Sequence, residues 1–274
     1  MKKLLFLVAL LPLLAHGQII ITVAGTGAQG FNGDGFAATA AKLNVPWALT
    51  LDKQGNVYFN DGSNERLRKI SPAYGGVIST IAGNGTADPT VGGLPAIYTG
   101  VFARDIAIHP KGNIFFVDNS DSKIWRISSD GIINLYAGTG AAGYNGDGIL
   151  AATAQLNRPT GVTVDDTGNI YVADQRNFRI RKIDTFGIIT TIAGTGIAGY
   201  SPDGSRADTA SLFDMLNIRA GYDNRLYFTD NLCIRRLNAD GTIITIAGNG
   251  TSGYSGDGGG CNWGKNCPRG TLDR

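Results

Sequence analysis

The sequence predicts an all-β fold in which one four-stranded unit repeats along the chain. The tetrapeptide Ala-Gly-x-Gly recurs at a spacing of 54 to 58 residues. Each interval holds four short runs rich in β-branched and aromatic residues, separated by turns of Gly, Asp and Asn, which is typical of antiparallel strands. One such sheet cannot bury both faces alone, so the units are expected to stack as the blades of a β-propeller. The copies begin at Ala24, Ala82, Ala137, Ala193 and Ala247.

The four strands are expected in the same order in every repeat. The first strand is predicted at 47–51, 105–108, 161–164 and 217–220. The second ends on an aspartate, at Asp61, Asp118, Asp174 and Asp230. The third, basic and apolar, is predicted at 66–70, 123–127, 179–183 and 233–237, and the fourth at 77–82, 132–137, 188–193 and 242–247. Ala-rich pieces at 37–43, 151–156 and 207–212 predict a turn or two of helix between blades.

The third repeat carries a recognisable motif. Residues 159–180 read Pro-x-Gly-Val-x-Val-Asp-x-x-Gly-Asn-Ile-Tyr-Val-Ala-Asp-x-x-Asn-x-Arg-Ile. This resembles an NHL repeat of the bacterial exported type, with long Gly-rich connections between blades. The resemblance covers about residues 19–258. It is looser in the second repeat, where His109-Pro stands for the turn aspartate, and in the fourth, where Met215 stands for proline.

The first 17 residues have the pattern of a secretory signal peptide. Lys2 and Lys3 precede the apolar run 4–14, and Ala15-His16-Gly17 forms a small-x-small cleavage site. We therefore expect an extracytoplasmic protein, periplasmic or secreted, with no lipid anchor and no membrane insertion after cleavage. The predicted domains are the signal peptide at 1–17, the propeller at 18–258 and a non-repeat tail at 259–274.

The two ends of the repeat region predict an incomplete ring. The run 19–24 matches the fourth strand of a blade whose other strands do not precede it, and the fifth repeat breaks off after Gly258. We expect four complete blades plus this orphan strand, as an open or truncated arc of a six-bladed ring, with a truncation or frameshift near Gly258. If the chain is instead a natural short form, its apolar end faces predict self-association.

The charge balance argues against nucleic acid and against an electrostatic membrane partner. Without Lys2 and Lys3 the chain carries 22 basic and 22 acidic residues. Three cysteines remain to be placed. Cys261 and Cys267 are spaced to pair across a short loop, whereas Cys233 is expected to be an unpaired, partly buried thiol, although the pairing cannot be assigned from the sequence.

Two glycine motifs follow the fourth strands. The pattern GxGxxG at 25–30 recurs at 138–143, 194–199 and 248–253, and no long helix follows any copy, so these are interpreted as structural turns rather than dinucleotide sites. The continuation Gly-aromatic-x-x-Asp-Gly has one carboxylate per loop, too few for a calcium site, and favours an aromatic plug with an Asp-Gly turn. No cofactor or metal is expected.

The aspartates that end the second strands allow two interpretations. A ring of carboxylates is able to bind a metal or a cationic ligand. Asp61, Asp118, Asp174 and Asp230 hold the same place in every repeat, which favours a structural role as Asx-type caps of the following turn.

Catalysis has little support in the sequence. His109 is the one histidine after the signal peptide, and no nucleophile with a credible base is apparent. We therefore expect a non-enzymatic module. The alternative is a propeller enzyme, a lyase or esterase, with its site in the central channel.

The binding prediction rests on positions where the repeats differ. At the start of the first strands, which line the channel, non-repeating polar and aromatic residues are candidates for a ligand site on the connection-bearing face and at the channel mouth. Ordinary drift within a repeat is an equally good explanation. The expected ligand is a protein, peptide or glycan. The candidates are Trp47, Arg104, Asp105, Asn217 and Arg219.

Overall fold

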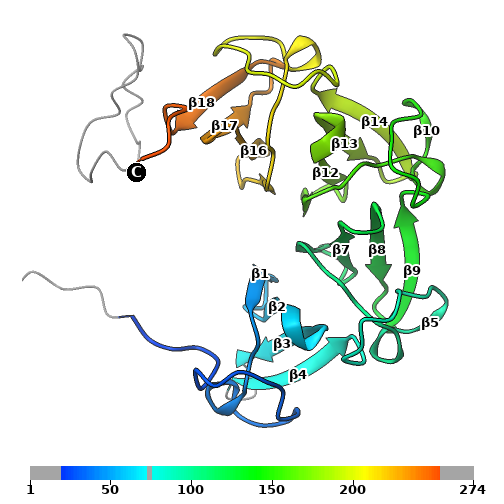
Figure 1. Ribbon diagram of the computed structural model, residues 1–274, viewed down its shortest axis with the longest axis vertical. Helices are drawn as coiled ribbons and strands as arrows, with labels where there is room; N and C mark the ends of the chain where they lie inside the picture. The colour runs from blue at the N-terminus through cyan, green and yellow to red at the C-terminus, as the bar shows by residue number, and fades with distance from the viewer. Residues whose placement is uncertain (1–19, 73–75, 254–274) are drawn as a thin grey trace, which may run out of the picture.

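The computed structural model describes residues 20–72 and 76–253, and these residues form an arc of four blades (Figure 1). In each blade four antiparallel strands follow one another in chain order. The first blade consists of β1 (Pro46–Leu51), β2 (Val57–Asp61), β3 (Arg66–Ser71) and β4 (Val77–Ala82). The second consists of β6 (Ile106–Ile108), β7 (Ile114–Asp118), β8 (Lys123–Ile127) and β9 (Ile132–Ala137).

The remaining two blades repeat this plan. The third contains β11 (Gly161–Val164), β12 (Ile170–Asp174), β13 (Arg179–Ile183) and β14 (Ile188–Ala193). The fourth contains β15 (Ile218–Ala220), β16 (Leu226–Asp230), β17 (Cys233–Leu237) and β18 (Ile243–Ala247). Strands β4, β9, β14 and β18 lie on the outside of the arc (Figure 1). The predicted all-β propeller of four-stranded blades is confirmed.

The connections between blades add short elements to the outer edges. Strands β5 (Leu94–Pro95) and β10 (Ile149–Leu150) pair antiparallel with β9 and β14. The Ala-rich pieces each form one short 3-10 helix, as expected. These helices are η1 (Ala38–Ala40), η5 (Ala151–Thr153) and η7 (Ala207–Thr209). The connection to the second blade contains η4 (Ala96–Tyr98), which was not predicted, and η2 (Gly62–Asn64) and η6 (Gln175–Asn177) lie between the second and third strands.

Apolar side chains fill the spaces between neighbouring blades. One core joins Leu67 and Ala82 of the first blade to Ile106 and Phe116 of the second. A second joins Phe115 to the third blade, and a third joins Ile180 to the fourth. Because neighbouring sheets bury these side chains between them, adjacent blades are held at fixed positions around the channel.

The expected orphan strand is not formed. Residues 20–24 have no strand structure, and Ile20 is 97% exposed. A strand requires a partner for its backbone N–H and C=O groups, and the described residues supply none here.

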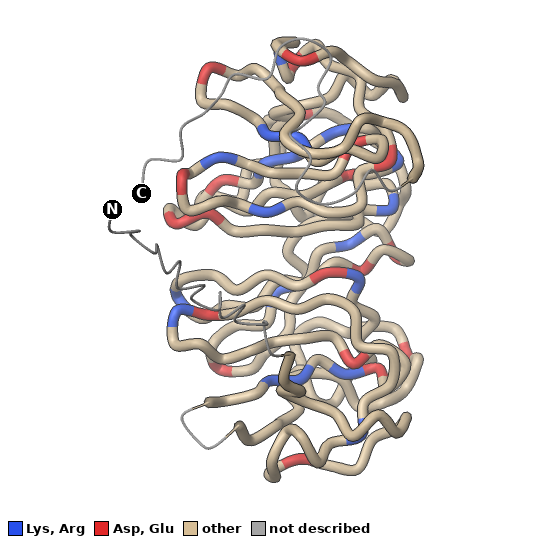
Figure 2. The backbone as a smooth tube through the Cα atoms, turned by 90° about the vertical axis from the view of Figure 1, so that its left-hand side faces the viewer, with Lys and Arg blue, Asp and Glu red and all other residues tan. Residues whose placement is uncertain are grey.

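Cys233 lies buried on β17 and makes no disulfide with any described residue. The signal peptide, the tail 259–274, Cys261 and Cys267 lie outside the described residues. Within residues 20–72 and 76–253, no helix is long and apolar enough to cross a membrane. Figure 2 shows basic and acidic residues interspersed over the blades.

Candidate functional site in the central channel

The first strands of the four blades, β1, β6, β11 and β15, are the inner strands of the arc. They enclose a hollow of about 500 Å³. Its lining begins within β1, β11 and β15, at Leu49, Val162 and Arg219, and at the first residue of β6, Ile106. In each case it continues into the turn that follows. The hollow therefore lies toward the ends of the inner strands, and every blade contributes to it.

An ion pair across the channel bounds the hollow on the side where the inner strands begin. Arg219 of the fourth blade donates to both carboxylate oxygens of Asp105 in the second blade, at 2.8 Å each. The backbone N–H of Val162, in the third blade, donates to Asp105 Oδ2 at 2.9 Å. The Asp105 side chain is 3% exposed and that of Arg219 is 42% exposed. This contact joins three blades and leaves the guanidinium accessible from the hollow.

The far rim of the hollow carries charged and aromatic side chains. Lys53 of the first blade lies 3.4 Å from Asp166 of the third, and both side chains are exposed. Tyr222, in the turn after β15, is fully exposed. With Asp52, Asp165 and His109 this rim offers both signs of charge beside apolar strand residues, the mixture that small ligand sites use.

Two aspartates of the rim, Asp52 and Asp165, accept hydrogen bonds from their own turns. Asp52 accepts hydrogen bonds from the backbone N–H groups of Gln54 and Asn56 and from the Tyr58 hydroxyl. Burial opposes ionisation of Asp52, but these hydrogen bonds outweigh it and hold its pKa below the usual value. Burial, together with the Asp52 carboxylate, raises the pKa of Tyr58 to about 12. Asp165 is bound in the same way by Asn169 and Tyr171.

His109 takes the place of this aspartate in the second blade. Its Nδ1 accepts the backbone N–H of Lys111 at 3.0 Å, as the carboxylates do in the first and third blades. Burial, and to a lesser degree the Lys111 charge, lower its pKa, so the ring is neutral at pH 7. No hydroxyl or thiol of the described residues hydrogen-bonds to it. In the part of the chain that the structure describes, His109 is thus bound to its own turn and is not hydrogen-bonded to a nucleophile.

The five sequence-predicted ligand residues fall into two pairs and one single residue. Arg219 lines the hollow and is bound to Asp105, which is buried. Trp47 and Arg104 lie together, with the guanidinium carbon 5.5 Å from the ring centroid. Trp47 is 51% exposed. Asn217 is exposed just before β15, with its backbone N–H donated to the Thr229 hydroxyl.

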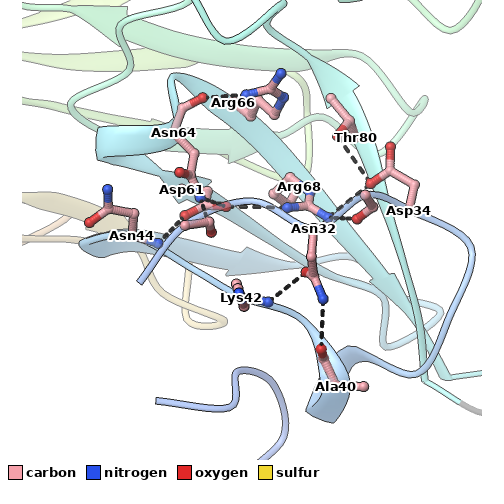
Figure 3. A network of polar contacts seen from close by, with 12 residues as sticks. Asn32, Asp34, Ala40, Lys42, Asn44, Asp61, Asn64, Arg66, Arg68 and Thr80 are labelled. Carbon is pink, nitrogen blue, oxygen red and sulfur yellow. Dashed lines mark hydrogen bonds and ion pairs between the residues drawn. The ribbon is translucent and has the colours of Figure 1, made fainter. Parts of the chain in front are cut away.

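A buried arginine in the third strand is a residue that the sequence analysis missed. Arg68 is fully buried and bonds to Asp61 Oδ2 at 3.2 Å and to Asp34 Oδ1 at 2.8 Å (Figure 3). The Phe31 ring covers its guanidinium at 4.9 Å. The glycine-loop aspartate therefore serves as an arginine partner as well as a turn residue. Arg181 and Arg235 repeat the arrangement, with Asp174 and Asp147 in the third blade and with Asp230 and Asp203 in the fourth.

The strand-ending aspartates accept hydrogen bonds from a different place than expected. The Oδ1 atoms of Asp61, Asp174 and Asp230 bind the backbone N–H of Asn44, Asn157 and Phe213. These three donors belong to the connection that enters the blade. The expectation that the three aspartates accept backbone N–H groups of the following turn was therefore wrong. Only Asp118 binds a turn N–H, that of Asp121. The reason is that the connection returns across the second strand and brings its own unpaired N–H groups there.

Comparison with known proteins agrees with the class that this geometry defines, a β-propeller of repeated four-stranded blades. A family model described as the teneurin NHL domain matches residues 139–202. Teneurin-1 of Gallus gallus is 29% identical over 84% of this chain, and human teneurin-4 is 30% identical over 77%. The chain carries NHL repeats, so the predicted resemblance to the NHL-repeat family is confirmed.

The match covers only part of each relative. The chain spans 9% of the length of the Gallus gallus protein and 8% of human teneurin-4. Among solved structures, an auxiliary nutrient binding protein of Bacteroides ovatus is similar, with a TM-score of 0.52 and 16% identity over 76% of this chain and 50% of that one. A Bacteroides thetaiotaomicron protein of unknown function has a TM-score of 0.53 at 22% identity, covering 72% of this chain and 46% of that one. These two likenesses concern the fold.

Proposed function

We propose that this chain is an exported, non-enzymatic binding module that holds a protein, peptide or glycan at the central channel. The observation that carries the proposal is the hollow of about 500 Å³ lined by all four inner strands. Concave sites of this size, with few polar groups among apolar ones, are the usual place for a ligand. Export rests on the predicted signal peptide.

The exposed residues at the two ends of the inner strands support recognition rather than chemistry. Tyr222 projects beside the hollow, and Trp47 with Arg104 forms an aromatic and cationic pair where the inner strands begin. Tyr, Trp and Arg are the residue types that contribute most to binding energy at interfaces. We place the ligand in the hollow, with contact to the connection-bearing face through the Trp47 pair.

A panel of peptides and oligosaccharides tests this proposal on the purified protein. Replacing Tyr222 by Ala is expected to lower the affinity for any ligand that the panel identifies by tenfold or more, which is about 1.4 kcal/mol of binding free energy. Trp47→Ala and Arg104→Ala report whether the ligand also reaches the connection-bearing face. Phe186→Ala is the matched control, because Phe186 is 86% exposed in the turn between β13 and β14.

Two results would contradict the proposal. One is a ligand whose affinity is unchanged in the Tyr222, Trp47 and Arg104 variants. The other is turnover of an ester or a cyclic substrate that depends on His109, because that result supports the enzyme alternative.

A further inference from the structure

The second blade keeps the strand-ending aspartate, Asp118, but lacks the other parts of the buried arginine network. Opposite Phe116, where the other blades place the arginine, it has Trp125. The aromatic cover, seven residues after Ala-Gly-x-Gly begins, is Pro89, and the aspartate three residues later is Gly92. Asp121 replaces the asparagine that bonds to the strand-ending aspartate in the first and third blades. The replacements occur together, which shows that the network is absent as a unit.

This loss leaves Asp118 without its usual partner. The residue is 4% exposed, and its Oδ1 accepts the Asp121 backbone N–H at 3.0 Å. Its Oδ2 accepts no hydrogen bond from any described residue, whereas the equivalent oxygens of Asp61 and Asp230 each bind an arginine. Burial raises the pKa of Asp118, and the Trp125 indole N–H opposes that rise as a nearby donor. Nε1 nevertheless makes no hydrogen bond of full geometry, and an indole carries no charge, so Trp125 replaces the arginine only in part.

A pocket of about 240 Å³ opens at this carboxylate. Glu65 of the first blade lines it as well, and its Oε2 is buried without a described partner. Asp88 and Asp121 lie on the exposed rim. Pro89, Val101 and Phe102 supply apolar walls. Buried carboxylates with unfilled acceptor capacity carry an energetic penalty, which a donor bound in this pocket would reduce.

The rim carboxylates have partners of their own. Asp88 Oδ2 accepts the Thr86 hydroxyl, and Lys123 lies 3.8 Å from Asp121 Oδ2. Lys123 also lies against the Trp125 ring, with its Nζ 5.7 Å from the ring centroid. Asp118 and Glu65 are therefore the carboxylates of this pocket that a bound cation would contact.

We propose that this pocket binds a guanidinium group, such as an arginine side chain of a peptide, beside the second blade's counterpart of the strand-ending aspartates that Arg68, Arg181 and Arg235 contact in the other blades. A planar guanidinium has the several donors needed to bridge separate carboxylates, and a lysine ammonium fits that geometry less well. Among the residues described, no three metal-ligating side chains are grouped to hold an ion. The site is separate from the channel hollow and shares no lining residue with it.

Nα-acetyl-L-arginine amide is the probe that tests this site. Titration of the full chain, followed by calorimetry and by the amide chemical shifts of Thr86 and Asp121, is expected to show binding. The neutral isostere Nα-acetyl-L-citrulline amide and the lysine analogue are expected to bind at least tenfold more weakly. Asp118→Asn and Glu65→Gln are each expected to lower the arginine affinity by at least tenfold.

Two further variants separate recognition from folding. Asp130→Asn changes an exposed turn carboxylate and is expected to leave binding unchanged. Trp125→Arg is expected to abolish binding of the probe, because it supplies a guanidinium from the chain itself. Tyr222→Ala should bind the probe normally, so failure of the channel proposal and failure of this one are distinguishable. Unchanged binding in Asp118→Asn, binding of citrulline or lysine derivatives as tight as that of arginine, or no binding at millimolar concentration would overturn the inference.

Discussion

At the scale of single residues, the buried arginines decide how each connection is attached to its blade. Arg181 is fully buried between Asp174 of its own sheet and Asp147 of the incoming connection. Desolvation makes such a group costly by itself, and the carboxylates offset that cost. Removing the arginine therefore leaves a buried carboxylate without compensation.

Arg181→Met is expected to lower the free energy of unfolding by about 3–5 kcal/mol, because Met fills similar space but leaves Asp174 unpaired. Urea denaturation measures the loss. Arg176→Met, at an exposed position in the same blade, should change it by less than about 0.5 kcal/mol. A loss below about 1 kcal/mol for Arg181→Met would show that the network is not structural.

Asp118 is expected to lower the stability of the folded protein, in contrast to the buried arginines. Burial raises its pKa, and the Asp121 charge adds to the shift, so the folded state holds the proton to higher pH than the unfolded state. The ionised group thus destabilises the fold near pH 7. This penalty begins to shrink as the pH falls through the folded pKa and is gone below the unfolded pKa.

Asp118→Asn should therefore be more stable than the parent protein at pH 7, and its advantage should shrink as the pH falls toward 4. Asparagine keeps an oxygen for the Asp121 N–H. Thermal unfolding of both proteins across this range measures the difference. A parent protein more stable than the variant at pH 7 would refute the interpretation that Asp118 lacks a compensating charge.

At the scale of elements, the turn after the inner strand is tied to the second strand by a hydrogen bond between a turn aspartate and a tyrosine in the first and third blades. The Tyr58 and Tyr171 hydroxyls bond to Asp52 and Asp165 at 3.1 and 2.9 Å. The second blade has His109, and at the tyrosine position it has Phe115, which is 3% exposed. The hydroxyl and its acceptor have been lost together.

This pairing predicts a coupled effect of two substitutions. Phe115→Tyr alone is expected to destabilise the protein by about 1–3 kcal/mol, because it buries a hydroxyl without its carboxylate. Combining it with His109→Asp should recover at least about 1 kcal/mol. A double-mutant cycle in urea measures the coupling. Additive effects of the two changes would mean that the positions are independent.

Strand positions were predictable because the period and the turn residues repeat. Strands such as β11 and β13 have the expected bounds, and others differ by one residue at an end. The arginine network was not predicted, because Arg68 in a basic strand also fits a solvated side chain. Its signal was present in the repeats: Trp125 and Gly92 replace the arginine and its aspartate in the same repeat. Reading replacements in pairs would have found it.

At the scale of the molecule, the contacts across the channel depend on the curvature of the arc. Asp105 and Arg219 come from the second and fourth blades, and nothing in the local sequence of either predicts their pairing. Both were selected from the sequence as ligand residues. In the structure they form an ion pair that joins the blades, with Arg219 still partly accessible, and their role in binding stays a prediction.

The apolar face of the first blade is open in this arc. Leu49 and Leu51 of β1 are each 59% exposed, and Trp47 adjoins them. Exposed apolar surface of this kind favours association. The sequence-based expectation of self-association remains a prediction, and light scattering at several concentrations measures it. A monomer at every concentration would contradict it.

The most direct test of the channel proposal is amide hydrogen exchange, with and without a ligand identified by the peptide and oligosaccharide panel. The ligand is expected to protect the turns that follow β1, β6 and β15, since these turns line the hollow. Protection confined to the outer strands β4, β9, β14 and β18, with those turns unchanged, would contradict it.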